Sequence, residues 1–167
     1  LGDASACEGD NVSFTTPYKT AGGYTFAWSG IRTATTESLS LTNVTTVDAG
    51  NVTVNIQSSE GCSGDTTIAL TVNTLPTPVL ANASICVGLT TTLNHTATGT
   101  TVWTLDGVVQ GETTSSIIAS QGGAYIATVT TAAGCIATAT SIVTSQALPV
   151  VNLGPAQEAC LGNSVTI

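Results

Sequence analysis

The sequence predicts an all-β protein made of tandem antiparallel β-sandwiches. Nowhere in the 167 residues does a helical period of three to four persist over ten residues. Apolar residues instead alternate with Thr and Ser in short segments, and turn signals separate these segments. A set of landmarks also recurs along the chain, and a fixed period is typical of repeat architectures.

The repeat is marked by a cysteine, any residue, a glycine and then an alternating strand, in ACEGDNVSF, ICVGLTTTL and ACLGNSVTI. After the first two copies come, in the same order, a tryptophan (Trp28, Trp103), a Gly-Cys pair (Cys62, Cys135) and a joint that contains proline. We expect an excerpt of a longer mature protein. The expected bounds are 1–75 for a first repeat with a truncated first strand, 76–147 for a second, and 148–167 for the truncated start of a third.

Each expected strand has one apolar face. In the second repeat, Asp106-Gly107 between two apolar runs predicts a two-residue hairpin turn, which needs positive φ at both positions. We expect Trp28 and Trp103 to be buried between two sheets, with Tyr125 closing the edge of its sandwich. The apolar faces of the first repeat are Tyr24, Phe26 and Trp28; Leu39 and Leu41; Val52, Val54 and Ile56; and Ile68, Leu70 and Val72. Those of the second repeat lie in 102–109, 115–119, 123–129 and 136–143.

The composition excludes several functions. Only 7% of residues are charged, two basic against ten acidic, which gives a net charge of −8. No basic stripe is present to displace counterions from phosphate or to attract anionic lipid, so we expect no nucleic-acid partner. The longest apolar runs are as short as strands, so we expect no membrane insertion in this segment. Five cysteines at regular positions favour an oxidising compartment and disulfides.

Two segments resemble immunoglobulin-like (Ig-like) domains, whose corner motif is Asp-x-Gly-x-Tyr. TTVDAGNVTV has Asp48 and Gly50 but Val52 at the tyrosine position, whereas the second repeat has Tyr125 but Gln121 in place of the aspartate. The cysteines do not occupy the usual Ig positions, so the repeats resemble bacterial Ig-like or PKD-like modules. The whole set of landmarks resembles repeats of very large secreted adhesins of Bacteroidetes-type bacteria, among them gliding-motility adhesins of the SprB kind.

The cysteine pairing has two alternatives. The resemblance treats the two cysteines of one repeat as a pair, which implies Cys7–Cys62 and Cys86–Cys135 and leaves Cys160 without a partner. In a plain Ig-like strand order, however, the first cysteine lies at the pole opposite the last hairpin, and bridged Cα atoms must lie within about 7 Å. That order favours Cys7–Cys135, a bond between repeats that would lock every joint of a longer chain. Of the two, the resemblance favours pairing within each repeat.

Few residues indicate chemistry, and we expect no catalytic residue, no metal and no cofactor. Glu8, Asp10, Glu60 and Asp65 flank the first two cysteine turns and form the strongest calcium candidate, but the second repeat has apolar residues at the matching places. Asp65-Thr66-Thr67 matches a short O-glycosylation pattern of Bacteroidetes secreted proteins, which makes Thr66 the candidate acceptor. The single histidine, His95, is expected on the surface.

The function that these features favour is that of a non-enzymatic stalk. The resemblance implies repeats that space and stiffen a secreted cell-surface adhesin, with possible roles in gliding motility and type IX secretion. The expected partners are neighbouring repeats of the same chain, the cell surface or the secretion and motility machinery, and an extracellular glycan or surface. The alternative is a carbohydrate-binding Ig-like module attached to a secreted enzyme. Aromatic residues are only 4% of the chain, which gives a sugar-stacking platform little support.

Overall fold

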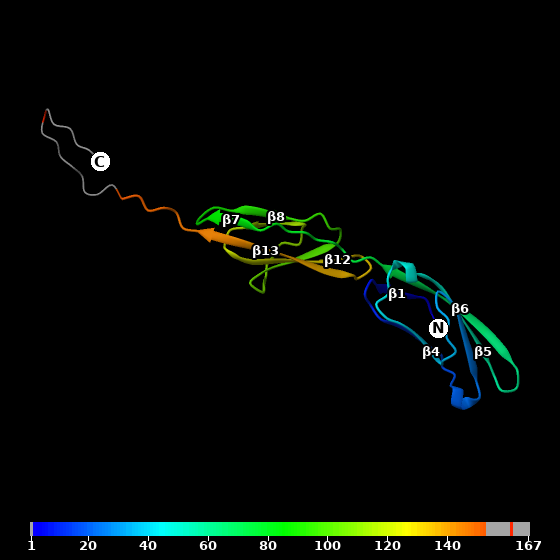
Figure 1. Ribbon diagram of the computed structural model, residues 1–167. Coiled ribbons are helices and arrows are strands. Elements are labelled where there is room, and N and C mark those ends of the chain that lie inside the picture. The colour runs from blue at the N-terminus through cyan, green and yellow to red at the C-terminus, as the bar shows by residue number, and fades with distance from the viewer. Residues whose placement is uncertain (1, 153–160, 162–167) are drawn as a thin grey trace.

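The computed structural model describes residues 2–152 and residue 161, and in them the chain forms two β-modules that lie end to end (Figure 1). The first module comprises β1 (Ala4–Cys7), β2 (Val12–Thr15), β3 (Thr25–Gly30), β4 (Ser38–Leu41), β5 (Gly50–Gln57) and β6 (Ser63–Asn73), with the 3-10 helices η1 (Thr20–Gly22) and η2 (Thr46–Asp48). The second module comprises β7 (Ala83–Cys86), β8 (Thr91–Asn94), β9 (Thr100–Leu105), β10 (Val108–Val109), β11 (Ser116–Ala119), β12 (Gly123–Thr130) and β13 (Ile136–Gln146). The predicted all-β class is correct.

Each module contains a larger and a smaller sheet. The strand orders are β1-β6-β5-β3 with β2-β4 in the first module, and β10-β9-β12-β13-β7 with β8-β11 in the second. Most pairs are antiparallel, as expected, but β1 runs parallel to β6 and β7 runs parallel to β13. These two parallel strands arise because the chain begins each module in the larger sheet and then crosses to the smaller one.

The crossing between sheets explains the repeated cysteine, any residue, glycine pattern. Cys7 is the last residue of β1, and the chain turns there before β2 enters the other sheet. Gly9 adopts a φ of 90° and Gly88 a φ of 86°, values that favour glycine over any residue with a Cβ atom. The repeated motif is therefore the corner at which the chain changes sheets.

One apolar core fills each module. Trp28 is 2% exposed and Trp103 is 0% exposed. Their indole N–H groups donate to the carbonyl oxygens of Thr36 and Thr114, at 2.8 and 2.9 Å. The first core consists of Phe14, Phe26, Trp28, Leu39, Leu41, Val44, Val52, Val54, Ile68, Leu70 and Val72. The second consists of Ile85, Leu93, Trp103, Ile117, Ala119, Tyr125, Ala127 and Val143. The residue bounds of the repeats stay a prediction, and most of 148–167 lies outside the described residues.

The turns follow local sequence closely. Asp106 and Gly107 have φ values of 48° and 84°, as the two-residue hairpin between β9 and β10 requires. Each module has only part of the Asp-x-Gly-x-Tyr corner motif. In the first, Asp48 caps η2 and pairs with Arg32 at 3.2 Å. In the second, the hydroxyl of Tyr125, which is 2% exposed, donates to the carbonyl of Gln121 at 3.2 Å.

Candidate functional site

The joint between the modules is closed by a disulfide between Cys7 and Cys135. Their Cα atoms lie 5.6 Å apart, and 128 residues of sequence separate them. The favoured pairing within each repeat, Cys7–Cys62 and Cys86–Cys135, is therefore wrong, and the alternative bond between repeats is the one that forms. Cys62 and Cys86 are free thiols. Cys160 lies outside the described residues.

The length of a strand prevents the pairing within a repeat. Cys7 aligns with Asn73 at one end of β6, and Cys62 precedes Ser63 at its other end. At about 3.3 Å per residue, the 11 residues of β6 separate these ends by roughly 35 Å. Cys135, by contrast, follows the β12–β13 turn, which faces the β1 end of the first module (Figure 1).

Asn73 is the central residue of this joint, a role that the sequence pattern does not indicate. Its carbonyl accepts the backbone N–H of Glu8 at 2.9 Å, and Cys135 Sγ approaches the same oxygen at 3.9 Å. Its amide Nδ2 donates to the Ser5 hydroxyl and to the Ala6 carbonyl, at 2.9 and 3.1 Å. Asn73 thus connects β1, β6 and the second module's turn, and only the folded strand order brings these three together.

The nine-residue connector 74–82 has no regular secondary structure, yet it is attached to the second module. The hydroxyl of Ser141 donates to the carbonyl of Ala81 at 2.7 Å, and the backbone N–H of Ile142 donates to the Asn82 side chain at 2.8 Å. Pro76 is buried. Because proline fixes φ, the connector has fewer conformations to lose when the joint closes.

The two free cysteines occupy turns that match the bonded ones. The β5–β6 turn that ends at Cys62 lies at the far pole of the first module, and the turn after Cys86 lies at the far pole of the second (Figure 1). Cys62 is exposed and Cys86 is partly buried. We call these ends of the molecule the Cys62 pole and the Cys86 pole.

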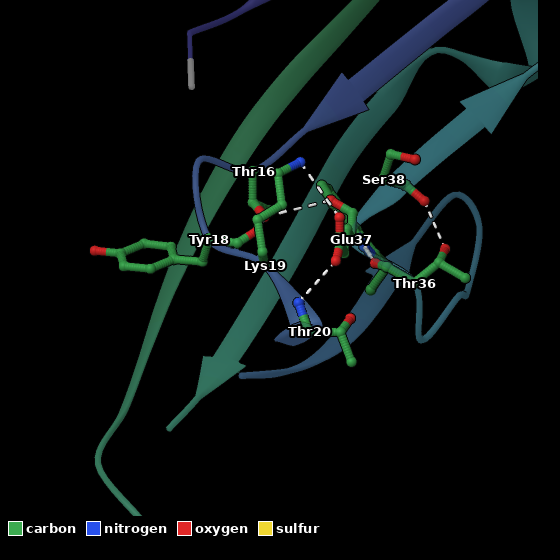
Figure 2. A network of polar contacts seen from close by, with 8 residues as sticks. Thr16, Tyr18, Lys19, Thr20, Thr36, Glu37 and Ser38 are labelled. Atoms are coloured by element: carbon green, nitrogen blue, oxygen red, sulfur yellow. Dashed lines mark hydrogen bonds and ion pairs between the residues drawn. The ribbon is translucent and has the colours of Figure 1, made fainter. Parts of the chain in front are cut away.

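At the Cys62 pole, the loop between β2 and β3 has two tyrosines and is held in place by Glu37 (Figure 2). The Glu37 carboxylate accepts the backbone N–H of Thr20 at 2.7 Å and pairs with Lys19 at 3.3 Å. The Thr20 backbone hydrogen bond is the main cause that lowers the pKa of Glu37 below its ordinary value; desolvation opposes it, and Lys19 adds to the lowering. The side chain of Tyr18 points away from this network, as Figure 2 shows.

Tyr18 packs against Tyr24, and the two ring centroids lie 4.8 Å apart. The pair belongs to a shallow open pocket of about 570 Å³. Its other lining residues include Ile56, Glu60 and the free Cys62. This pocket could not be predicted from the sequence, because the tyrosines and the β5–β6 turn meet only in the folded module.

The four calcium candidates do not converge. Glu8 and Asp10 lie beside the Cys7 turn, where the Asp10 carboxylate accepts the backbone N–H of Cys7 at 2.8 Å. Glu60 and Asp65 lie at the other end of β6, in and after the β5–β6 turn. Among residues 2–152 and 161, no three His, Cys, Asp or Glu side chains are placed to hold a metal ion.

His95 is not on the surface, which corrects the expectation for this residue. It is 5% exposed and lies directly after β8, in line with the inward-facing Leu93. Its Nε2 atom is 3.1 Å from the hydroxyl of Thr101, and its ring lies 5.9 Å from that of Trp103. Because the alternation of β8 continues one residue past the strand, His95 points into the core.

Thr66, the candidate for O-glycosylation, lies on β6 opposite Val54 and is partly exposed. It also lines the tyrosine pocket. Thr67, the next residue, is exposed and shares a hydrogen bond with the Thr53 hydroxyl at 2.8 Å. The candidacy of Thr66 stays a prediction.

Comparison with known proteins shows the fold alone. No family model matches the chain, and no curated protein matches it. The I-band fragment I67-I69 from titin is 15% identical with a TM-score of 0.51, over 87% of this chain and 63% of that one. The N-terminal four Ig domains of Dscam1 isoform 6.9 are 14% identical with a TM-score of 0.41, over 87% of this chain and 44% of that one. Murine CEACAM1b is 16% identical with a TM-score of 0.45, over 85% of this chain and 96% of that one. The chain therefore spans less than two thirds of the titin and Dscam1 structures.

The likeness to the titin fragment, together with the sheet topology, shows an Ig-like fold. In the part of the chain that the structure describes, no helix has the length and apolar character needed to cross a membrane.

Proposed function

We propose that the chain is a structural spacer, a pair of stiffened Ig-like repeats within a secreted cell-surface adhesin. The observation that carries this proposal is the Cys7–Cys135 bond, which fixes one module relative to the next. A hinge between two binding modules needs no such bond, whereas a rod does. The proposal keeps 1–75 and 76–147 as repeats and 148–167 as the start of another.

Further parts of the proposal rest on the sequence resemblance. They are a non-enzymatic role, location on the extracellular cell surface, export by type IX secretion and a part in gliding motility. The partners proposed are neighbouring repeats, the secretion or motility machinery and an extracellular surface. The low positive charge, two basic residues in the chain, supports the absence of a nucleic-acid partner.

Small-angle X-ray scattering tests the spacer directly. We expect the oxidised chain to give one elongated envelope with a narrow distance distribution. The Cys7→Ser/Cys135→Ser variant should broaden that distribution, because only the nine-residue connector then limits bending. Cys62→Ser is the matched control, since it removes a thiol far from the joint. If the two variants scatter alike, the joint is not stiffened by the bond and the spacer proposal fails.

The alternative role, a carbohydrate-binding module, would be favoured by tryptophans exposed in a groove, and both tryptophans are buried. The aromatic pair that remains is the exposed Tyr18 with the half-buried Tyr24. A glycan array on the intact chain, with Tyr18→Ser as control, tests this role. We expect no glycan to be retained; a hit that Tyr18→Ser abolishes would replace the spacer with a binding module.

A further inference from the structure

Both free cysteines lie in turns with the same hydrogen bonds as the bonded cysteines. The backbone N–H of Val87 donates to Gln146 and that of Leu89 to Cys86, both at 2.9 Å. The Cys7 turn has the same two bonds, from Glu8 to Asn73 at 2.9 Å and from Asp10 to Cys7 at 3.1 Å. The Cys86 turn is thus already in the conformation that presents Cys7 to its partner.

The same holds at the other pole. The backbone N–H of Ser58 donates to the carbonyl of Cys62 at 2.8 Å, as that of Thr131 does to Cys135 at 2.9 Å. Gly61 and Gly134 both have a φ of 86°. Cys62 therefore occupies the same position in the first module as Cys135 does in the second.

The surfaces around the two free thiols also suit one another. Val87 and Leu89, on the Cys86 turn, are each 59% exposed and uncharged. The pocket beside Cys62 offers the rings of Tyr18 and Tyr24, against which apolar side chains can be buried.

Charge disfavours a contact between the Cys62 pole and a second acidic turn. Glu60 and Asp65 line the Cys62 pole, and the Cys7 turn has acids of its own, so these two would repel each other. In the observed joint the acidic Cys7 turn instead faces the β12–β13 turn, whose residues 131–135 have no charge. Docking of the uncharged Cys86 turn on the acidic Cys62 pole would likewise place acidic residues on only one side of the joint.

We propose that the Cys86 turn docks on the Cys62 pole of a second copy and forms a Cys86–Cys62 disulfide. This inference rests on the proposed spacer function and names a second copy of the chain as the source of the neighbouring repeat. Successive contacts of this kind join different patches, so they build a head-to-tail filament and not a closed dimer. The bond forms as two thiols give up two protons and two electrons to a disulfide oxidant such as oxidised glutathione, which becomes two thiols.

The test uses the whole chain in a glutathione redox buffer, with Cys160→Ser in every variant. Cys62→Ser and Cys86→Ser are each incubated alone and then mixed in equal amounts. Each alone should stay monomeric, whereas the mixture should give a linked pair that stops at two copies. The chain with both cysteines should give a ladder on non-reducing electrophoresis, with a Cys62–Cys86 peptide between isotope-labelled and unlabelled copies.

Either of two results overturns the proposal. In the first, the single variants form homodimers as fast as the mixture forms the mixed pair, which means that the thiols oxidise without docking. In the second, no linked species forms, which means that the two poles do not meet. Leu89→Glu should slow the mixed pair roughly tenfold by facing Glu60 and Asp65. Val47→Glu, at an exposed residue of η2 that lies toward the joint and away from both poles, should leave the rate unchanged. Small-angle scattering tests the joint within one chain, whereas this experiment tests the contact between copies. Failure of this inference therefore leaves the spacer proposal standing, and failure of the spacer proposal would be seen in the scattering alone.

Discussion

The two modules share a backbone frame but fill it differently. At the position where the first module buries Phe26, the second buries the hydroxyl of Thr101; Ile68 is likewise matched by Ser141. The buried Thr16, whose hydroxyl donates to backbone carbonyls, is matched by His95. The cores therefore differ in polarity, while the strand registers and the cysteine turns agree.

This contrast shows which features specify the fold. The turns are fixed by residues that backbone geometry requires, such as Gly9 and Gly88, and by strand lengths that set where each cysteine lies. The interior tolerates a hydroxyl or an imidazole provided that it finds a hydrogen-bond partner. Ser141 finds the connector's Ala81 carbonyl, so the polar core of the second module also ties down the joint.

The largest expected effect comes from removing the bond that joins the modules. Cys7→Ser should lower the summed free energy of unfolding by about 5 kcal/mol, because the bond closes a loop of 128 residues in the unfolded chain. Urea denaturation should then show two separate transitions instead of coupled ones. Cys62→Ser should unfold like the unmodified chain; equal midpoints for Cys7→Ser and Cys62→Ser would show that the bond contributes nothing.

The tryptophans allow each module to be broken alone. Trp103→Ala should cost the second module about 3–5 kcal/mol and unfold it, because the cavity cannot be refilled. Trp28 is then the single indole and reports on the first module. Its fluorescence should keep the emission of a buried tryptophan while circular dichroism shows loss of strand signal. Trp28→Ala is the matched experiment, in which the first module should unfold and Trp103 report on the second. If either variant unfolds both modules, the two modules fold as one unit.

The polar core of the second module predicts a smaller effect. Thr101→Val should cost roughly 1–2 kcal/mol, because it leaves the buried His95 Nε2 atom without its partner. Adding His95→Phe should recover most of that loss, because it removes the buried nitrogen atom that Thr101→Val leaves without a partner. A double-mutant cycle by denaturation measures the coupling; additive losses would show that the hydrogen bond is not what holds this pair.

The smallest expected effect is a loss of stability at acidic pH, and it should be confined to the first module. Backbone hydrogen bonds from Thr20 and Thr45, then Lys19 and Arg32, lower the pKa of Glu37 and Asp48. Their stabilisation is complete above ordinary carboxyl pKa values of about 4, and is lost as pH falls through the lowered folded values.

In a Trp103→Phe background, the Trp28 fluorescence midpoint in urea should therefore decline as the pH falls below about 4. Glu37→Gln with Asp48→Asn should flatten that decline. The second module, followed through Trp103 in a Trp28→Phe background, serves as the reference, and an equal acid slope in both modules would contradict the assignment.

The sequence predicted local features well and long-range ones poorly. The Asp106-Gly107 hairpin, the alternating faces and the repeat follow from neighbours in the chain, and the structure has them. The disulfide pairing depended on strand length and on the sheet to which β1 belongs, which a spacing of cysteines does not reveal. His95 was misplaced for a related reason, since a polar residue just past a strand can continue its inward face.

The Cys7–Cys135 bond also decides how the molecule carries tension. A pull applied at the two termini travels from residue 7 across the sulfur atoms to residue 135 and never passes through the chain between them. That bypassed length could otherwise extend by about 400 Å. If the bypassed residues unfold, the molecule lengthens little, because the bond still holds residues 7 and 135 together. Most of both sandwiches is therefore sheltered from force, and extension is limited by covalent bonds.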